Sequence, residues 1–204
     1  MWLGLPQLFI FPIVPLVMRH VDPRLMVAFG LLLFAVSCFM NSYLTHDWGI
    51  EQFRWSQLVR AAGQPFMITP LSALAAGSQP EPQQAHASAI FNIMRNLGGS
   101  VGIAMLATFL TNREHLHFSV IAERLTQNSP RTAQAIDQFT HVLAAKAPAN
   151  VAHMQAVAEL ANMVRREAFT MAYSDCFFVL GIALLFAMLG LLLVPNPKQG
   201  TIAH

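Results

Sequence analysis

Apolar residues occur along this chain in long blocks, and short polar stretches separate most of the blocks. A helix needs about 20 mostly apolar residues to cross the hydrocarbon core of a bilayer. The pattern therefore predicts five transmembrane helices. The first carries three prolines, so we expect it to be short or kinked. The predicted spans cover residues 2–17, 25–44, 53–76, 88–110 and 169–194.

The segment 113–167, between the fourth and fifth spans, has a different pattern. Ser129-Pro130 is typical of a helix start, with Ser as the N-cap and Pro at the first helical position. Apolar residues then recur at helical spacing, and a second apolar stripe follows Pro148. We predict two amphipathic helices that lie on the membrane surface or against each other. The alternative is a docking surface for an outer partner.

The charges of the short connections predict the orientation. The first connection carries Arg19 and Arg24, whereas the second, 45–52, carries two acids and no Lys or Arg. Basic loops tend to remain in the cytoplasm, although Arg54 just beyond the second connection weakens the contrast. The predicted division is residues 1–112 for the first four spans, 113–167 outside the membrane, 168–195 for the last span and 196–204 for a cytoplasmic tail.

Composition supports a multi-pass protein surrounded by lipid. Hydrophobic residues make up 55% of the 204 residues and charged residues only 11%, whereas soluble domains carry about 25% charged residues. The formal net charge is +2, which gives no reason to expect a nucleic-acid partner. We therefore expect an all-α integral membrane protein.

Three ionisable residues fall well inside the predicted spans: Arg60, Arg95 and Asp175. A charge in lipid is costly, so each should face protein or water. Arg60 and Asp175 lie at similar depth, which predicts an ion pair if their helices touch. The alternative is that Arg60 binds carbonyls or another chain and Asp175 binds water. Arg95 either reaches the cytoplasmic headgroups or forms part of an inner gate with Asn92 and Asn96.

Small residues and prolines mark two further features of the spans. Gly98 and Gly102 have the spacing of a close-packed helix face, and Gly99 lies beside them. Bending at these glycines is the alternative to packing. Pro65 and Pro70 are predicted to break the third span, and prolines there free carbonyls that can line a cavity. A plain structural kink is the alternative.

The sequence shows no catalytic constellation. His115-x-His117 is a weak metal signal without further ligands, and there is no His-Glu-x-x-His, Gly-x-Ser-x-Gly or phosphate-binding loop. We therefore expect no metal, no cofactor and no enzymatic activity.

Three stretches together resemble the C-terminal portion of the major facilitator superfamily, in particular the fourteen-helix EmrB/QacA-type drug:proton antiporters. They are residues 15–26, 60–71 and 92–102. The most specific is Asn92-Ile-Met-Arg95-Asn96-Leu-Gly98-Gly99-Ser100, which is similar to a signature of that family. The first stretch departs from the family, because Asp22-Pro23-Arg24 stands where an acidic-basic pair is usual.

The resemblance implies the last five of fourteen helices of a proton-coupled multidrug efflux permease, a class associated with antibiotic resistance. It implies a multi-pass protein of the bacterial inner membrane that is incomplete by itself. Its substrates would be amphipathic drug-like compounds. Its partners would be the missing N-terminal half or another copy, and a periplasmic adaptor that touches 113–167. The implied transport pathway includes Arg60, Gln64, Asn92 and Arg95, with Met94 nearby. The alternative is a non-transporting membrane interaction or scaffold protein.

Overall fold

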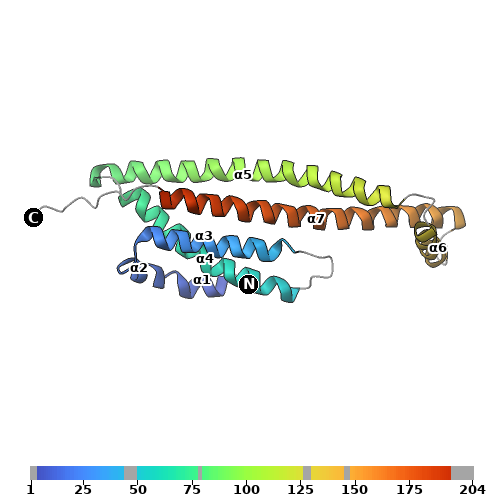
Figure 1. Ribbon diagram of the computed structural model, residues 1–204, viewed down its shortest axis with the longest axis horizontal. Coiled ribbons are helices and arrows are strands. Elements are labelled where there is room, and N and C mark those ends of the chain that lie inside the picture. Colours follow the sequence, from blue (N-terminus) through green and yellow to red (C-terminus); the bar gives the residue numbers. More distant parts are fainter. Residues whose placement is uncertain (1–3, 44–49, 78–79, 126–129, 145–147, 194–204) are drawn as a thin grey trace, which may run out of the picture. The chain divides into compact units, whose positions relative to one another are not determined.

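The computed structural model describes residues 4–43, 50–77, 80–125, 130–144 and 148–193. Within these residues all regular structure is helical (Figure 1). The predicted all-α membrane fold is therefore confirmed, whereas the predicted cytoplasmic tail lies outside the described residues. The helices are α1 (Gly4–Ile10), α2 (Ile13–Met18), α3 (Pro23–Asn41), α4 (Ile50–Gly77), α5 (Glu81–Arg124), α6 (Pro130–Ala144) and α7 (Ala149–Leu193).

Three of the described helices are long and apolar enough to cross a membrane by length and composition: α3, α5 and α7. The first predicted span is instead divided into α1 and α2, and Pro12 precedes the first residue of α2. Proline cannot donate the backbone hydrogen bond that would continue a helix, which explains the division. Of the five predicted spans, those that correspond to α3, α5 and α7 thus have helices of suitable length and composition. The first span and the one in α4 remain predictions.

Helices α5 and α7 continue far beyond the predicted spans. They contain 44 and 45 residues, and a 44-residue helix is about 66 Å long, roughly twice the hydrocarbon thickness of a bilayer. The boundaries predicted at 112 and 168 therefore fall inside continuous helices. No Gly or Pro occurs in 111–124 or 149–168, so nothing in the sequence stops either helix there.

Helix α5 also begins before residue 88, where the fourth span was predicted to start. Helix α5 begins at Glu81, and Pro82 lies in its first turn. Proline is tolerated at this place because the backbone amides of a first helical turn have no intrahelical partner.

The chain divides into two compact units. The described residues of the first unit are 4–43, 50–77, 80–104 and 177–193, and those of the second unit are 105–125, 130–144 and 148–176. Helices α1 to α4 belong to the first unit together with the beginning of α5 and the end of α7. Helix α6 belongs to the second unit with the remainder of α5 and α7.

Two glycines bring α3 and α4 into close contact within the first unit. A Cβ atom built on Gly30 would lie 2.8 Å from the carbonyl oxygen of Gly63 and 2.8 Å from the amide nitrogen of Met67. A Cβ atom on Gly63 would lie 3.0 Å from the oxygen of Gly30. Only residues without side chains allow helix backbones to approach so closely.

Further contacts between α3 and α4 lie on both sides of the glycines. The rings of Phe29 and Phe66 meet edge to face, with their centroids 5.8 Å apart. The buried hydroxyl of Ser37 donates a hydrogen bond of 2.9 Å to the backbone oxygen of Ser56. Small side chains, aromatic contact and interhelical hydrogen bonding are the usual means of joining helices in lipid.

Helix α4 is continuous through Pro65 and Pro70, contrary to the break that the sequence predicted. Both prolines are fully buried. Each removes one backbone donor from the helix, but the packing of α4 against its neighbours retains the helical path on both sides. Their part in a hinge or in the lining of a pathway stays a prediction.

The two cysteines, Cys38 in α3 and Cys176 in α7, are both free and buried. They fill space as small apolar side chains.

The glycine contact generates a direct prediction about stability. Gly63→Ala and Gly30→Ala should each lower the free energy of unfolding by about 1–3 kcal/mol, because the added methyl meets backbone or Cβ atoms. Gly98→Ala is the matched control, since no atom lies within 4 Å of a Cβ there. Thermal unfolding in detergent, followed by circular dichroism, measures the difference. Equal stability of the three variants would contradict a close α3–α4 contact.

Candidate functional site

Polar side chains on α4 form the first part of the candidate site. The side chain of Gln7 in α1 donates a hydrogen bond of 2.8 Å from Nε2 to Oε1 of Gln64. One turn away, the guanidinium of Arg60 donates to Oε1 of Gln57 at 2.6 Å. Gln64 and Arg60 are both half-buried. Helix α4 thus carries the amide of Gln64 and the guanidinium of Arg60, and a hydrogen bond from α1 holds the amide in place.

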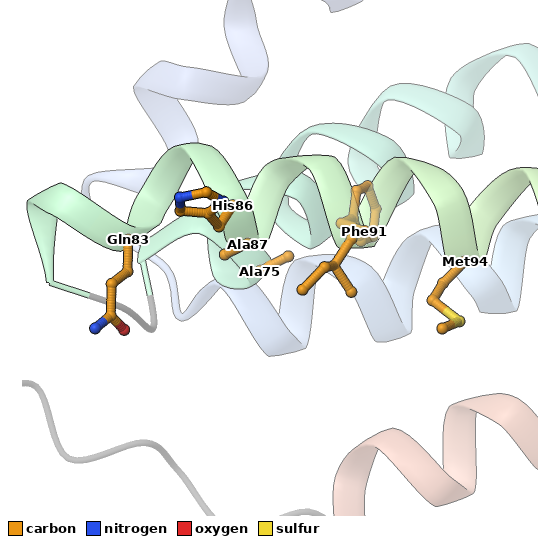
Figure 2. A pocket seen from close by; sticks show the side chains of 7 residues that line it. Ala75, Gln83, His86, Ala87, Phe91 and Met94 are labelled. Atoms are coloured by element: carbon orange, nitrogen blue, oxygen red, sulfur yellow. The ribbon is translucent and has the colours of Figure 1, made fainter.

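A cavity of about 720 Å³ lies between the end of α4 and the beginning of α5. Figure 2 shows its lining, to which α4 contributes Ala75. From α5 it is lined by Gln83, His86, Ala87, Ile90, Phe91 and Met94. Its volume falls in the range of small-molecule sites, and its lining has the mixture of apolar side chains and a few polar groups that such sites share. Sequence reasoning had singled out Met94 alone from this set.

Asn92 and Arg95 lie on α5 within the same stretch and are exposed. Asn92 donates from Nδ2 to the backbone oxygen of Ser88 at 3.0 Å, so its amide oxygen stays available. Arg95 forms no ion pair or hydrogen bond with any residue that the structure describes. Large apolar side chains around them are exposed too, including Ile93 and Leu97.

The glycines of the same helix have open surroundings. No atom lies within 4 Å of a Cβ atom built on Gly98, Gly99 or Gly102. The close packing or bending predicted for these glycines therefore has no counterpart among the described contacts and stays a prediction. This part of α5 combines polar, apolar and small residues, and most of those that the structure describes are exposed.

Asp175 in α7 is held by residues of the second unit. Its Oδ2 atom lies 2.8 Å from Nε2 of His117 and 3.4 Å from Nε of Arg113, both in α5. The predicted partner, Arg60, belongs to the first unit. Each residue thus has a described partner other than the one predicted, and the Arg60–Asp175 ion pair stays a prediction.

Glu114 forms a second polar contact between α5 and α7 that sequence reasoning missed. Its side chain is 5% exposed and accepts a hydrogen bond of 3.3 Å from Nε of Arg165. The available signal was the charge pattern, since 113–117 contains one arginine, one acid and two histidines, and 165–175 contains arginines and acids of complementary charge. These residues were assigned to a separate outer segment, so the pairing was not considered.

Comparison with known proteins finds similarity to transporters and resistance proteins. The chain is 22% identical over 199 residues to the multidrug export protein EmrB of Escherichia coli K12, which covers 97% of this chain and 37% of that protein. It is 28% identical over 137 residues to the colistin resistance protein EmrB of Acinetobacter baumannii, covering 67% of this chain and 27% of that protein. The fatty acid resistance protein FarB of Neisseria gonorrhoeae is 24% identical over 174 residues, 85% of this chain and 33% of FarB.

This chain is a relative of the EmrB-type transporters. The resemblance to EmrB-type proteins of the major facilitator superfamily, first seen in the 92–102 motif, is thereby confirmed. The relatives carry the names of transporters and resistance proteins rather than of enzymes. The chain spans about a third of the length of the curated relatives it matches. No family model and no solved structure matches it.

Double-mutant cycles can show whether Asp175 interacts with His117, as in the structure, or with Arg60, as the sequence predicted. We expect His117→Ala and Asp175→Asn to be coupled by about 1–2 kcal/mol in unfolding free energy, because a charged acceptor loses its partner. The cycle of Arg60→Ala with Asp175→Asn is the comparison, measured by the same thermal unfolding. Strong coupling in that cycle and none in the His117 cycle would contradict the described pairing.

Proposed function

We propose that this chain is the C-terminal part of a proton-coupled efflux permease for amphipathic toxic compounds in the bacterial inner membrane, and that it has no enzymatic activity. The observation that carries the proposal is a similarity to the multidrug export protein EmrB that extends over 97% of the chain. The name of the A. baumannii relative, a colistin resistance protein, and that of FarB agree with resistance to membrane-active compounds. Proton coupling follows from the family resemblance.

The cavity between α4 and α5 supports a pathway for such compounds. Phe91 and Met94 offer apolar, adaptable surface, since the unbranched thioether of methionine fits ligands of differing shape. His86 and Gln83 add polar contacts at the same cavity. A site of this kind favours molecules that are largely apolar and carry few polar groups.

Asn92, Arg95, Arg60 and Gln64 are proposed as the polar residues along the pathway. Asn92 and Arg95 are exposed on the uncovered face of α5, and Arg60 and Gln64 are half-buried on α4. An arginine at membrane depth needs protein, water or headgroups around it. Residues beyond this chain would therefore supply the opposite wall of the pathway.

The proposed partners are the remaining helices of the transporter, or another copy of the chain, against the open face of α5. Ile90, Ile93 and Leu97 on that face are each more than half exposed. Substrate sites in secondary transporters lie at the interface between two halves, which agrees with an unpaired face here. A periplasmic adaptor on 113–167 is proposed in addition, because α6 and the extended helices would reach beyond the membrane.

Transport by the chain alone and by the chain joined to its upstream coding region tests the proposal. In proteoliposomes with an imposed proton gradient, we expect dye efflux from the joined protein and none from this chain alone. Collapse of the gradient with an ionophore is the control. Efflux by this chain alone would contradict the need for further helices, and a folded but inactive joined protein would contradict the proposed transport.

Within the joined protein, Asn92→Ala should lower the efflux rate by roughly fivefold or more if the amide contacts substrate. Thr111→Ala is the matched control, because Thr111 also bonds to the carbonyl four residues earlier on α5, at 3.0 Å. Loss of such a local hydrogen bond is therefore common to both variants. Initial efflux rates at equal protein levels are the measurement, and equal rates for the two variants would exclude Asn92 from the pathway.

A further inference from the structure

The second unit contains a cavity of its own, lined by residues of α6 and of the parts of α5 and α7 that belong to this unit. Its volume is about 480 Å³. Most of its lining is apolar, with Phe118 from α5, Ile136 from α6 and Val157 and Leu160 from α7. A cavity of this size with an apolar lining fits a drug-sized molecule.

Thr132 supplies a buried polar group at this cavity. The residue is 3% exposed, and its Oγ1 atom has no hydrogen-bond partner among the described residues. Buried hydroxyls in folded proteins nearly always have a partner, so a lone one calls for an explanation. Thr140, on the same helix, shows the usual solution: its hydroxyl donates to the backbone oxygen of Ile136 at 2.7 Å. A bound molecule with a polar group would provide Thr132 with its missing partner.

The charged residue in the cavity lining determines which charge the bound molecule should carry. Asp137 is the one formally charged side chain among the lining residues that the structure describes, and no described residue pairs with it. His153 is the only other titratable residue of that lining. An unpaired carboxylate attracts a cation and repels an anion such as a fatty acid.

We propose that the cavity between α5, α6 and α7 is a binding site for a small amphipathic cation. The apolar body of the ligand lies among Phe118, Ile136 and Leu160, an N–H group donates to Thr132 Oγ1, and the positive charge lies near Asp137. This site is separate from the cavity of the first unit. It does not depend on the proposed transport, because binding is measured on the chain itself.

The probe that tests the proposal is 9-aminoacridine, a flat cation with an amino group and intrinsic fluorescence. The full chain is placed in nanodiscs of zwitterionic lipid, and binding is followed by fluorescence anisotropy, with the signal of empty nanodiscs subtracted. We expect saturable binding that Ala161→Trp abolishes, because the indole fills the cavity that Ala161 lines. Circular dichroism verifies that each variant retains its helical content.

Pairs of variants distinguish the contributions of the Thr132 hydroxyl and the Asp137 carboxylate from the effect of losing any hydroxyl or any acid on these helices. Thr132→Val should lower the affinity by about fivefold, whereas Thr140→Val, which removes a hydroxyl outside the lining, should leave it unchanged. Asp137→Asn should lower it by a similar factor, whereas Glu159→Gln, an exposed acid of α7 outside the lining, should not. The uncharged analogue 9-aminoanthracene should bind more weakly, and this difference should disappear in Asp137→Asn.

Three results would overturn the proposal. The first is binding of 9-aminoacridine that Ala161→Trp leaves intact, since the ligand would then occupy another place. The second is equal binding of the cation and the uncharged analogue by the unmodified chain. The third is displacement of 9-aminoacridine by laurate at equal or lower concentration, which would make the cavity a site for an acyl chain. Each of these results would leave the efflux measurement on the joined protein unaffected.

Discussion

The close approach of α3 and α4 at Gly30 and Gly63 is the contact on which the described part of the first unit depends. Between helices in lipid, burial of apolar side chains gives little driving force, so association relies on backbone proximity, packing and hydrogen bonds. The distance of 2.8 Å from a Cβ built on Gly30 to the oxygen of Gly63 shows how little room remains there. This contact determines where α4 lies. Helix α4 in turn carries Arg60 and Gln64, and the side chain of Gln7 in α1 is bonded to Gln64.

Helix α5 has more glycines than either of these helices, yet its glycines contact nothing among the described residues. The spacing of Gly98 and Gly102 was recognisable in the sequence, whereas Gly30 and Gly63 are isolated on their own helices and gave no repeat to notice. Spacing indicates that a face can be approached closely, but it does not say which helix approaches it. Sequence reasoning therefore identified the family and the polar face of α5 and missed the glycine contact that the structure contains.

The positions of the apolar blocks were predictable, and the ends of the helices were not. Hydropathy reports where a helix is compatible with lipid, whereas helicity continues through polar residues until a breaker occurs. For this reason α5 and α7 extend well past the predicted spans. The same assumption of an outer loop concealed the residues that surround Asp175, because Arg113 and His117 were assigned to a separate segment. The cavity between the end of α4 and the beginning of α5 was only partly predicted from the sequence. Apart from Met94, the residues that line it form no recognisable motif.

The burial of Cys38 and Cys176 has a consequence for chemical labelling. These are the only cysteines of the chain, and both are enclosed as free thiols. Thiol reagents react with groups they can reach, so the two native cysteines should be labelled little. A single cysteine introduced at an exposed position of α5, such as Ser100 or Met94, would carry a spin label or fluorophore without prior removal of the native thiols. The mobility of that label and its access to solvent could then be measured on a chain that differs from the natural one at a single residue.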